Sequence, residues 1–126
     1  MLKIREEQFD AFRAHAEQSF EDRMFAHISR CWPVQAAEMT EPKLRLLIRT
    51  SLSRAGEHGL KAEYDVGRYI DCAFILGEQF EQDARIPWAR ATLGSSRSPH
   101  DRAEMLWART KDWLAGLPKP REEKRG

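Results

Sequence analysis

The stretch from Glu63 to Trp88 constrains the fold of this chain more than any other. It holds an apolar helical run, then Gly77, then a Pro87-Trp88 pair, with no gap between them. Apolar residues recur there at spacings of three and four, which places them on one broad face of a helix that must be buried. The glycine directly after the run predicts the end of that helix and an irregular segment up to Trp88. The apolar residues are Val66, Tyr69, Ile70, Ala73, Phe74 and Leu76.

Two helices are predicted before this central one. The first covers residues 5–30, where apolar side chains step along one side and the opposite face is mixed in charge. Trp32-Pro33 ends it, because the residue before a proline is pushed out of the helical region. Residues 34–39 are expected to form a linker or a short turn. The second helix begins at Thr40, whose hydroxyl is expected to cap free amides, and runs to about Ala55.

Two more helices are predicted after it. Pro87 begins a short one that ends at Gly94. Ser98 begins the last with three signals: a serine cap, a proline at the first helical position and an acid three residues after the cap. We therefore expect an all-α domain over residues 1–116, a small bundle of four main helices and a short fifth. Residues 117–126 are charged and proline-rich and are expected to form a disordered tail.

The buried faces of these helices predict one hydrophobic core, and 126 residues are enough to form it without a metal or a disulfide. Tyr69 and Trp88 are expected to be largely buried, because both are large aromatic residues in the central stretch. The predicted core residues are Phe20, Leu47, Tyr69, Ile70, Phe74, Trp88 and Trp113.

The charge balance gives no electrostatic reason to expect nucleic acid, since 21 Lys and Arg face 20 Asp and Glu, for a formal net charge of +1. No apolar stretch has the length of a signal peptide or a membrane span, so neither a membrane partner nor export is expected, and the expected location is the cytoplasm. Cys31 and Cys72 are expected to be reduced core thiols, with a single bridge between them left open.

Signals for catalysis or metal binding are weak. His15 and His27 lie on the first helix but twelve residues apart, too far to share a metal, and no co-ligand is expected near either. The chain has no phosphate-binding glycine loop, and no Cys/His pair with a third orienting group is expected. We therefore expect a protein that is not an enzyme and holds no metal and no cofactor.

Two neighbouring acidic segments are the candidate binding surface. The central helix carries three charged residues spaced three apart, which form either a local ion-pair network or a partner contact. The loop after it carries three acids around one aromatic, which either folds back onto the core or anchors a partner. If exposed, the two segments form one acidic patch that suits a basic protein, and the exposed face of the first helix is the next candidate. The predicted partner-binding residues are Asp65, Arg68, Asp71, Glu78, Phe80, Glu81 and Asp83.

The central run DVGRYIDCAFILGEQFEQDARIPWA resembles a family of small bacterial proteins encoded beside type VI secretion genes, next to PAAR-repeat spike tips, effector chaperones and toxin/immunity pairs. The segments IREEQFDAF near the N-terminus and P..RAEML late in the chain add to the resemblance, which extends to about Leu114. Its most specific portion, RYID..F.LG..F..D..IPWA, carries no catalytic residues.

The resemblance implies a non-enzymatic accessory factor, a co-chaperone that works with an effector adaptor to load a toxin on the PAAR tip. The alternative is an immunity protein that binds and blocks a cognate toxin. Immunity proteins that block nucleases often have a strong acidic bias, and this chain is nearly neutral, which favours the co-chaperone. Either role implies a protein partner, which is an effector chaperone or adaptor, a PAAR protein or a toxin. The oligomeric state is left open.

Overall fold

The computed structural model describes the backbone of residues 6–117 and the side chains of residues 14–117. Every regular element in that range is helical, which confirms the prediction of an all-α protein. The elements are α1 (Glu6–Cys31), α2 (Pro33–Glu38), α3 (Glu41–Glu57), α4 (Glu63–Leu76), the short 3₁₀-helix η1 (Phe80–Gln82), α5 (Pro87–Leu93) and α6 (Pro99–Ala115).

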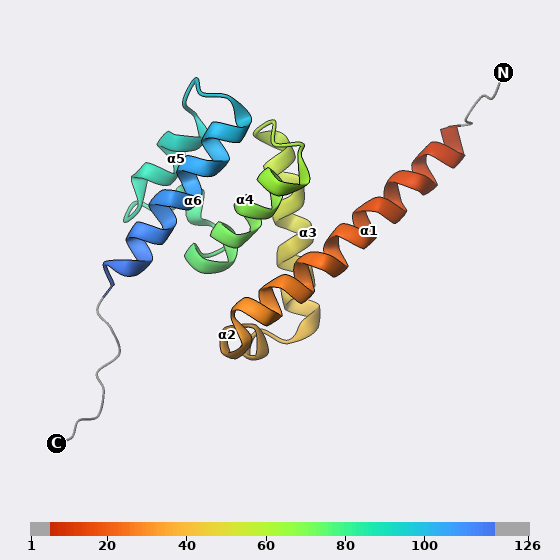
Figure 1. Cartoon of the computed structure of the whole chain (residues 1–126), viewed down its shortest axis with the longest axis horizontal. Coiled ribbons are helices and arrows are strands. Elements are labelled where there is room, and N and C mark those ends of the chain that lie inside the picture. Colours follow the sequence, from red (N-terminus) through yellow and green to blue (C-terminus); the bar gives the residue numbers. More distant parts are fainter. Residues whose placement is uncertain (1–5, 118–126) are drawn as a thin grey trace.

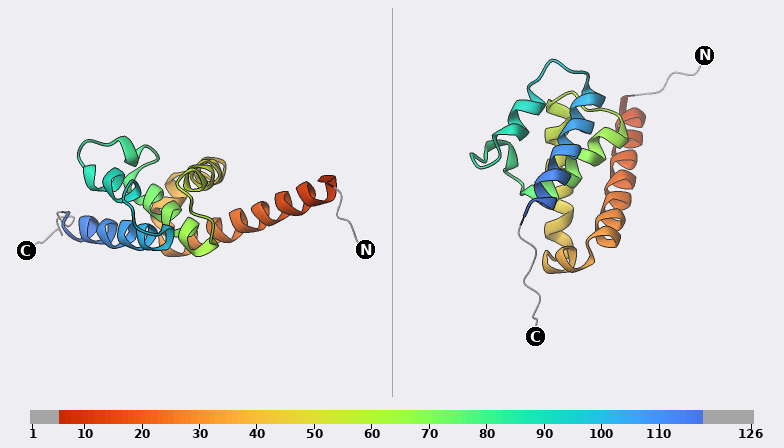
Figure 2. Two further views of the ribbon diagram at one scale, coloured as in Figure 1. Left: turned by 90° about the horizontal axis from the view of Figure 1, so that it is seen from above. Right: turned by 60° about the vertical axis from the view of Figure 1, so that its left-hand side comes forward.

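Helix α4 lies at the centre of the fold (Figure 1). It packs against α6 and α3 and also contacts α1, while α5 packs against α6 and η1. The short α2 turns the chain between α1 and α3. Helix α1 runs on past the rest of the molecule, so that its N-terminal half projects from one end, as Figure 1 and the left view of Figure 2 show.

Most helix ends follow the predicted signals. Gly77 ends α4 with a φ of 111°, a backbone conformation that residues with a side chain rarely adopt. Ser98 caps α6, because its hydroxyl accepts a hydrogen bond from the backbone N–H of Asp101 at 3.2 Å. Thr40 occupies the cap position of α3, but its hydroxyl accepts no capping hydrogen bond, so that part of the prediction is wrong.

The segment expected to be a linker contains a helix. Pro33 ends α1, as predicted, but it also occupies the first turn of α2, where a missing N–H has no cost and the fixed φ of proline suits a helix. Ala36 points into the core and anchors this short helix. The Trp-Pro pair is therefore a corner between two helices.

The predicted core is buried at four positions and half-buried at three. Tyr69 and Ile70 of α4 lie at its centre, and Phe20 and Leu47 join them from α1 and α3. Phe74, Trp88 and Trp113 are half-buried and pack against the core from its edge. The Trp88 ring packs against the edge of the core and not at its centre. Helix α5 is short and lies at the side of the fold, where Ala89 and Leu93 face inward instead.

Phe80 is buried, with 1% of its surface exposed. Its ring centroid lies 5.3 Å from that of Tyr69, so η1 folds the segment after Gly77 back onto α4. Of the two alternatives for this aromatic, packing on the core is the one observed. The prediction that Phe80 is an exposed anchor for a partner is wrong, because its side chain has no free surface to offer.

The two cysteines lie in different environments and are both free thiols. Cys72 is buried in the core, as predicted. Cys31 lies at the end of α1 and is exposed, so its placement in the core is wrong. The tail predicted over residues 117–126 falls, from residue 118 on, outside the described residues. None of the helices between residues 6 and 117 combines the length and apolar character of a membrane span.

Replacing Phe80 with alanine is expected to lower the free energy of unfolding by about 3–5 kcal/mol, because it removes a large buried ring from the contact with Tyr69. Urea unfolding followed by circular dichroism measures the change. Leu46→Ala is the matched control, since 55% of Leu46 is exposed and its loss should change stability by less than about 0.5 kcal/mol. Equal unfolding midpoints for the two variants would contradict the burial of Phe80.

Candidate functional site

The predicted acidic patch is divided among internal partners. Asp65 and Asp71 of α4 have only 5% and 4% of their surface exposed. Oδ1 of Asp65 lies 2.7 Å from Nδ1 of His100 on α6, and Oδ1 of Asp71 lies 3.1 Å from Nε2 of His27 on α1. Burial raises the pKa of Asp71, although His27 and Arg68 oppose that shift. The placement of these two acids on an outer face is therefore wrong.

Arg68 is the one member of the predicted trio that borders solvent. Its guanidinium lies 3.6 Å from Oδ2 of Asp71, so one ion pair of the expected ladder exists. The same group lies over the rings of Tyr64 and Trp107, with its central carbon 5.0 Å and 4.7 Å from their centroids. The contact with Trp107 ties α4 to α6, and together the three contacts hold Arg68 in a structural role.

The acids of the loop after α4 also face partners within the chain. Glu81 accepts a hydrogen bond from the hydroxyl of Tyr69 and lies 2.8 Å from Nε2 of His58. Burial raises the pKa of Tyr69 well above its usual range, and the hydrogen bond to Glu81 adds a smaller shift in the same direction. Asp83 pairs with Arg85, which lowers the pKa of Asp83 to about 2. With Phe80 buried at its centre, this loop does not form the single exposed acidic patch that the sequence predicted.

Glu78, the remaining predicted acid, is half-exposed. Its backbone carbonyl accepts a hydrogen bond from Arg54 of α3 at 2.6 Å. This bond fixes the start of the loop against α3 and leaves the Glu78 side chain as a single charge at the surface. One such charge is a weak basis for recognition.

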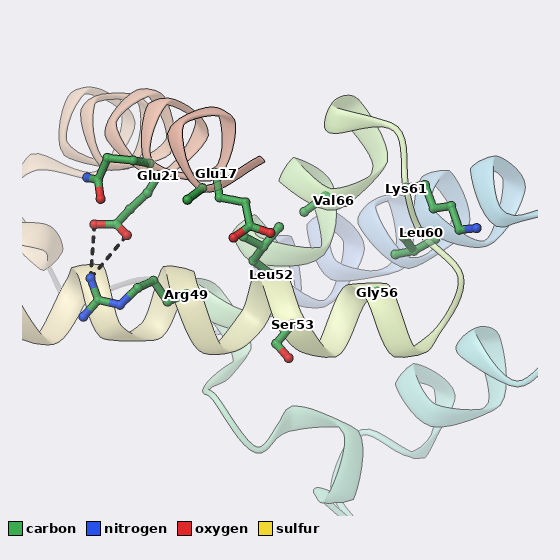
Figure 3. A pocket seen from close by; sticks show the side chains of 11 residues that line it. Glu17, Glu21, Arg49, Leu52, Ser53, Gly56, Leu60, Lys61 and Val66 are labelled. Carbon is green, nitrogen blue, oxygen red and sulfur yellow. Dashed lines mark hydrogen bonds and ion pairs between the residues drawn. The ribbon is translucent and has the colours of Figure 1, made fainter. Parts of the chain in front are cut away.

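A different surface has the shape of a binding site. A groove with a volume of about 590 Å³ opens between α1 and α3, and the start of α4 closes one end (Figure 3). Its volume lies in the range typical of ligand sites, but few polar groups converge on one point within it. The residues that line it are Ala14, Glu17, Gln18, Glu21, Arg49, Leu52, Ser53, Gly56, Leu60, Lys61 and Val66.

An ion-pair network closes the other end of the groove. The Glu21 side chain is almost fully buried, and it lies 2.8 Å from Arg45 and 3.2 Å from Arg49, both on α3. Arg45 also pairs with Asp22 and Glu41, each within 2.9 Å. These carboxylates raise the pKa of Arg45, and the bond to Arg45 lowers the pKa of Asp22. We call this set the Glu21 network, and it fastens α1 to α3.

The groove widens where α1 leaves the Glu21 network. Residues 14–18 of α1 are exposed, and Glu17 reaches toward Leu52 of α3 (Figure 3). Gly56 has open space in front of it, because a β-carbon built there would meet no atom within 4 Å. Leu60 and Val66 lie buried below, and half-exposed Leu52 supplies the apolar surface that borders the groove. Such a surface, bordered by charges of both signs, suits the apolar face of an amphipathic helix from another protein.

A second cluster joins α1 to α4. Sγ of Cys31 lies 3.8 Å from Nδ1 of His27, whose Nε2 faces Asp71. The expectation that no Cys/His pair with a third orienting group exists is therefore wrong. The spacing of four residues on one helix was a readable signal for the first pair. Among the side chains of residues 14–117, no group of three or more His, Cys, Asp or Glu is placed to hold a metal ion.

Comparison with protein-family models, with curated proteins and with solved structures found no match to this chain.

Arg45→Met is expected to lower the free energy of unfolding by about 1.5–3 kcal/mol, because Glu21 stays buried with only Arg49 to neutralise it. Methionine keeps most of the apolar stem of the arginine side chain, so the loss of stability reports on the removed positive charge. Urea unfolding measures it. The control is Arg85→Met, which breaks an ion pair whose arginine is exposed and should leave the unfolding midpoint unchanged. A midpoint for Arg45→Met equal to that of the control would show that the Glu21 network does not hold α1.

The His100–Asp65 pair is expected to make stability depend on pH. The hydrogen bond to Asp65 raises the pKa of His100 above its usual value near 6.5, so protonated His100 stabilises the folded state. That contribution is complete below the unfolded pKa, under about pH 6, and disappears as pH rises through the folded pKa. The melting temperature of His100→Gln should therefore fall below that of the wild type at acidic pH and approach it above about pH 8. A constant difference across this range would rule out the effect.

Proposed function

We propose that this protein is a non-enzymatic, cytosolic accessory factor of type VI secretion that binds a protein partner through the groove between α1 and α3. In this role it acts as a co-chaperone that assists an effector adaptor in loading a toxin on the PAAR spike tip. The scaffold consists of the longer helices α1, α3, α4 and α6 together with the short helices α2 and α5. The secretion context comes from the resemblance of the central run.

The observation that carries the binding role is the course of α1. Past the Glu21 network, no element between residues 6 and 117 covers residues 14–18 of this helix, and Leu52 of α3 stays half-exposed beside them. A continuous helix that extends beyond its own domain offers a second helix a long contact, and the partner buries apolar surface that the domain alone leaves open. This supports recognition of a helix.

The charges along the groove indicate the character of the partner. Glu17 lies on the α1 side, while Arg49 and Lys61 lie toward opposite ends of the hollow (Figure 3). A partner helix with charges of both signs meets this border better than a uniformly basic surface does. The mixed border therefore favours an adaptor or chaperone helix over the strongly basic surface of a nuclease toxin.

Gly56→Tyr is expected to abolish co-purification with the partner while leaving the fold intact. A β-carbon at this position meets no atom within 4 Å, so the new side chain has room to enter the groove. Because glycine is a poor helix former, the substitution should also stabilise α3. The measurement is a pull-down of the tagged protein expressed from its native operon, with mass spectrometry of the bound proteins. Gly116→Tyr is the matched control, since Gly116 lies at the end of α6 and a β-carbon there makes only ordinary contacts, at 3.5 Å and 3.6 Å.

Capture of the same partner at wild-type yield by Gly56→Tyr would reject the groove as the binding surface. Deletion of the gene separates the two roles. Loss of a co-chaperone stops export of the toxin and leaves the cell healthy, whereas loss of an immunity protein poisons the cell or its sister cells. Growth inhibition that depends on a neighbouring toxin gene would therefore overturn the co-chaperone proposal.

A further inference from the structure

We propose that Cys31 is a nucleophilic thiol, with His27 as its general base and Asp71 as the group that positions this base, and that it forms mixed disulfides with small-molecule disulfides. This modification site is separate from the groove and does not depend on the proposed function.

The three side chains stand in the order that nucleophilic chemistry requires. Cys31 and His27 lie one turn apart on α1, with 3.8 Å between Sγ and Nδ1, which is within reach of a hydrogen bond to sulfur. On the other side of the ring, Nε2 lies 3.1 Å and 3.4 Å from the two oxygens of Asp71. An ionised carboxylate only accepts hydrogen bonds, so Nε2 carries the proton and Nδ1 presents its lone pair to the thiol.

The solvent exposure of the three side chains decreases from Cys31 through His27 to Asp71. Cys31 is exposed, 34% of the His27 side chain is exposed, and only 5% of the Asp71 side chain is. Arg68 lies 3.6 Å from Oδ2 of Asp71 and helps to hold the carboxylate in place. A sheltered acid thus orients a ring whose far nitrogen faces an accessible thiol, which is the arrangement by which a base activates a nucleophile.

The charged groups around the imidazole set the pH dependence of the site. From α4, Asp71 faces the ring, and Arg68 and Glu63 line the same shallow hollow of about 260 Å³ beside it. From α1 itself, Cys31 contacts the ring, and Arg23 and Arg30 lie about one turn away, with Arg23 paired to Glu63. Cys31 lies in the last turn of α1, where the helix dipole disfavours negative charge. The thiol therefore depends on His27 to accept its proton.

The reaction balances without any group beyond the disulfide. The Cys31 thiol gives its proton to Nδ1 of His27, and its sulfur attacks one sulfur of the disulfide. A new S–S bond forms on Cys31, the old S–S bond breaks, and the departing thiolate takes the proton from His27. Asp71 stabilises the imidazolium in between. The small-molecule disulfide is the oxidant, and half of it leaves as a thiol.

Cys72 provides an internal reference for this reactivity. It is fully buried in α4, where Thr110 of α6 donates a hydrogen bond to its sulfur at 3.3 Å. Burial raises the pKa of Cys72 to about 12. A reagent that cannot enter the core therefore leaves this thiol untouched while the protein is folded, and it reacts only on unfolding.

The test measures thiol–disulfide exchange of the folded, full-length chain with the aromatic disulfide 5,5′-dithiobis(2-nitrobenzoate), whose released thiolate is coloured. One thiol per chain is expected to react quickly, and Cys31→Ser should remove this phase. His27→Gln should slow it about tenfold at neutral pH, because the base is gone. His100→Gln is the matched control, since it removes a histidine bonded to another aspartate of α4 but remote from any cysteine, and its rate should equal that of the wild type.

Two further measurements separate the base from the fold. In concentrated guanidinium, variants that keep both cysteines should react at one rate, because the cluster no longer exists. The pH profile of the exchange rate should differ between the wild type and His27→Gln, because only the wild type holds the base. Asp71→Asn, with its helical spectrum checked, should give an intermediate rate. A His27→Gln rate equal to wild type across the pH range, or a Cys31 rate no faster folded than unfolded, would overturn the proposal.

Discussion

The structure depends on the burial of α4 among three other helices. Because α1, α3 and α6 all contact it, little of its surface reaches solvent, and each of its polar groups needs a partner inside the protein. The partners come from α1, η1 and α6, so polar contacts specify which neighbour packs where. Within the described residues the pairs are Asp65 with His100, Asp71 with His27, Tyr69 with Glu81 and Cys72 with Thr110.

The sequence predicted the helices well because their ends carry local chemistry. Gly77 and Ser98 are signals that act over a few residues, and both operate as expected. The spacing of Asp65 and Asp71 also placed them correctly on one helix, but helical periodicity does not say which side of a helix faces solvent. Their histidine partners are 35 and 44 positions away in the chain, and no local pattern encodes that pairing.

The candidate sites show the same difference between local signals, which the sequence reveals, and contacts between distant segments, which it does not. Phe80 lies in η1, a single short turn that is too short for an apolar period to indicate direction, so its neighbours left both burial and exposure open. His27 and Cys31 were readable as a pair from their spacing, but the carboxylate that gives the pair its chemistry belongs to α4. The groove has no motif at all, since it exists only because α1 is longer than the surface that α3 offers it.

That excess length divides α1 into two regions of unequal stability. Its 26 residues span about 39 Å, and the half that includes Ile28 is held by the core, whereas residues 14–18 are exposed and are not covered by another helix of the described residues. A helix without tertiary support is marginal in water, so this part can fray and reform while the domain stays folded. Any partner that covers this part of α1 must also supply the free energy that orders it. The affinity of the complex is lower as a result, and the partner is released more readily.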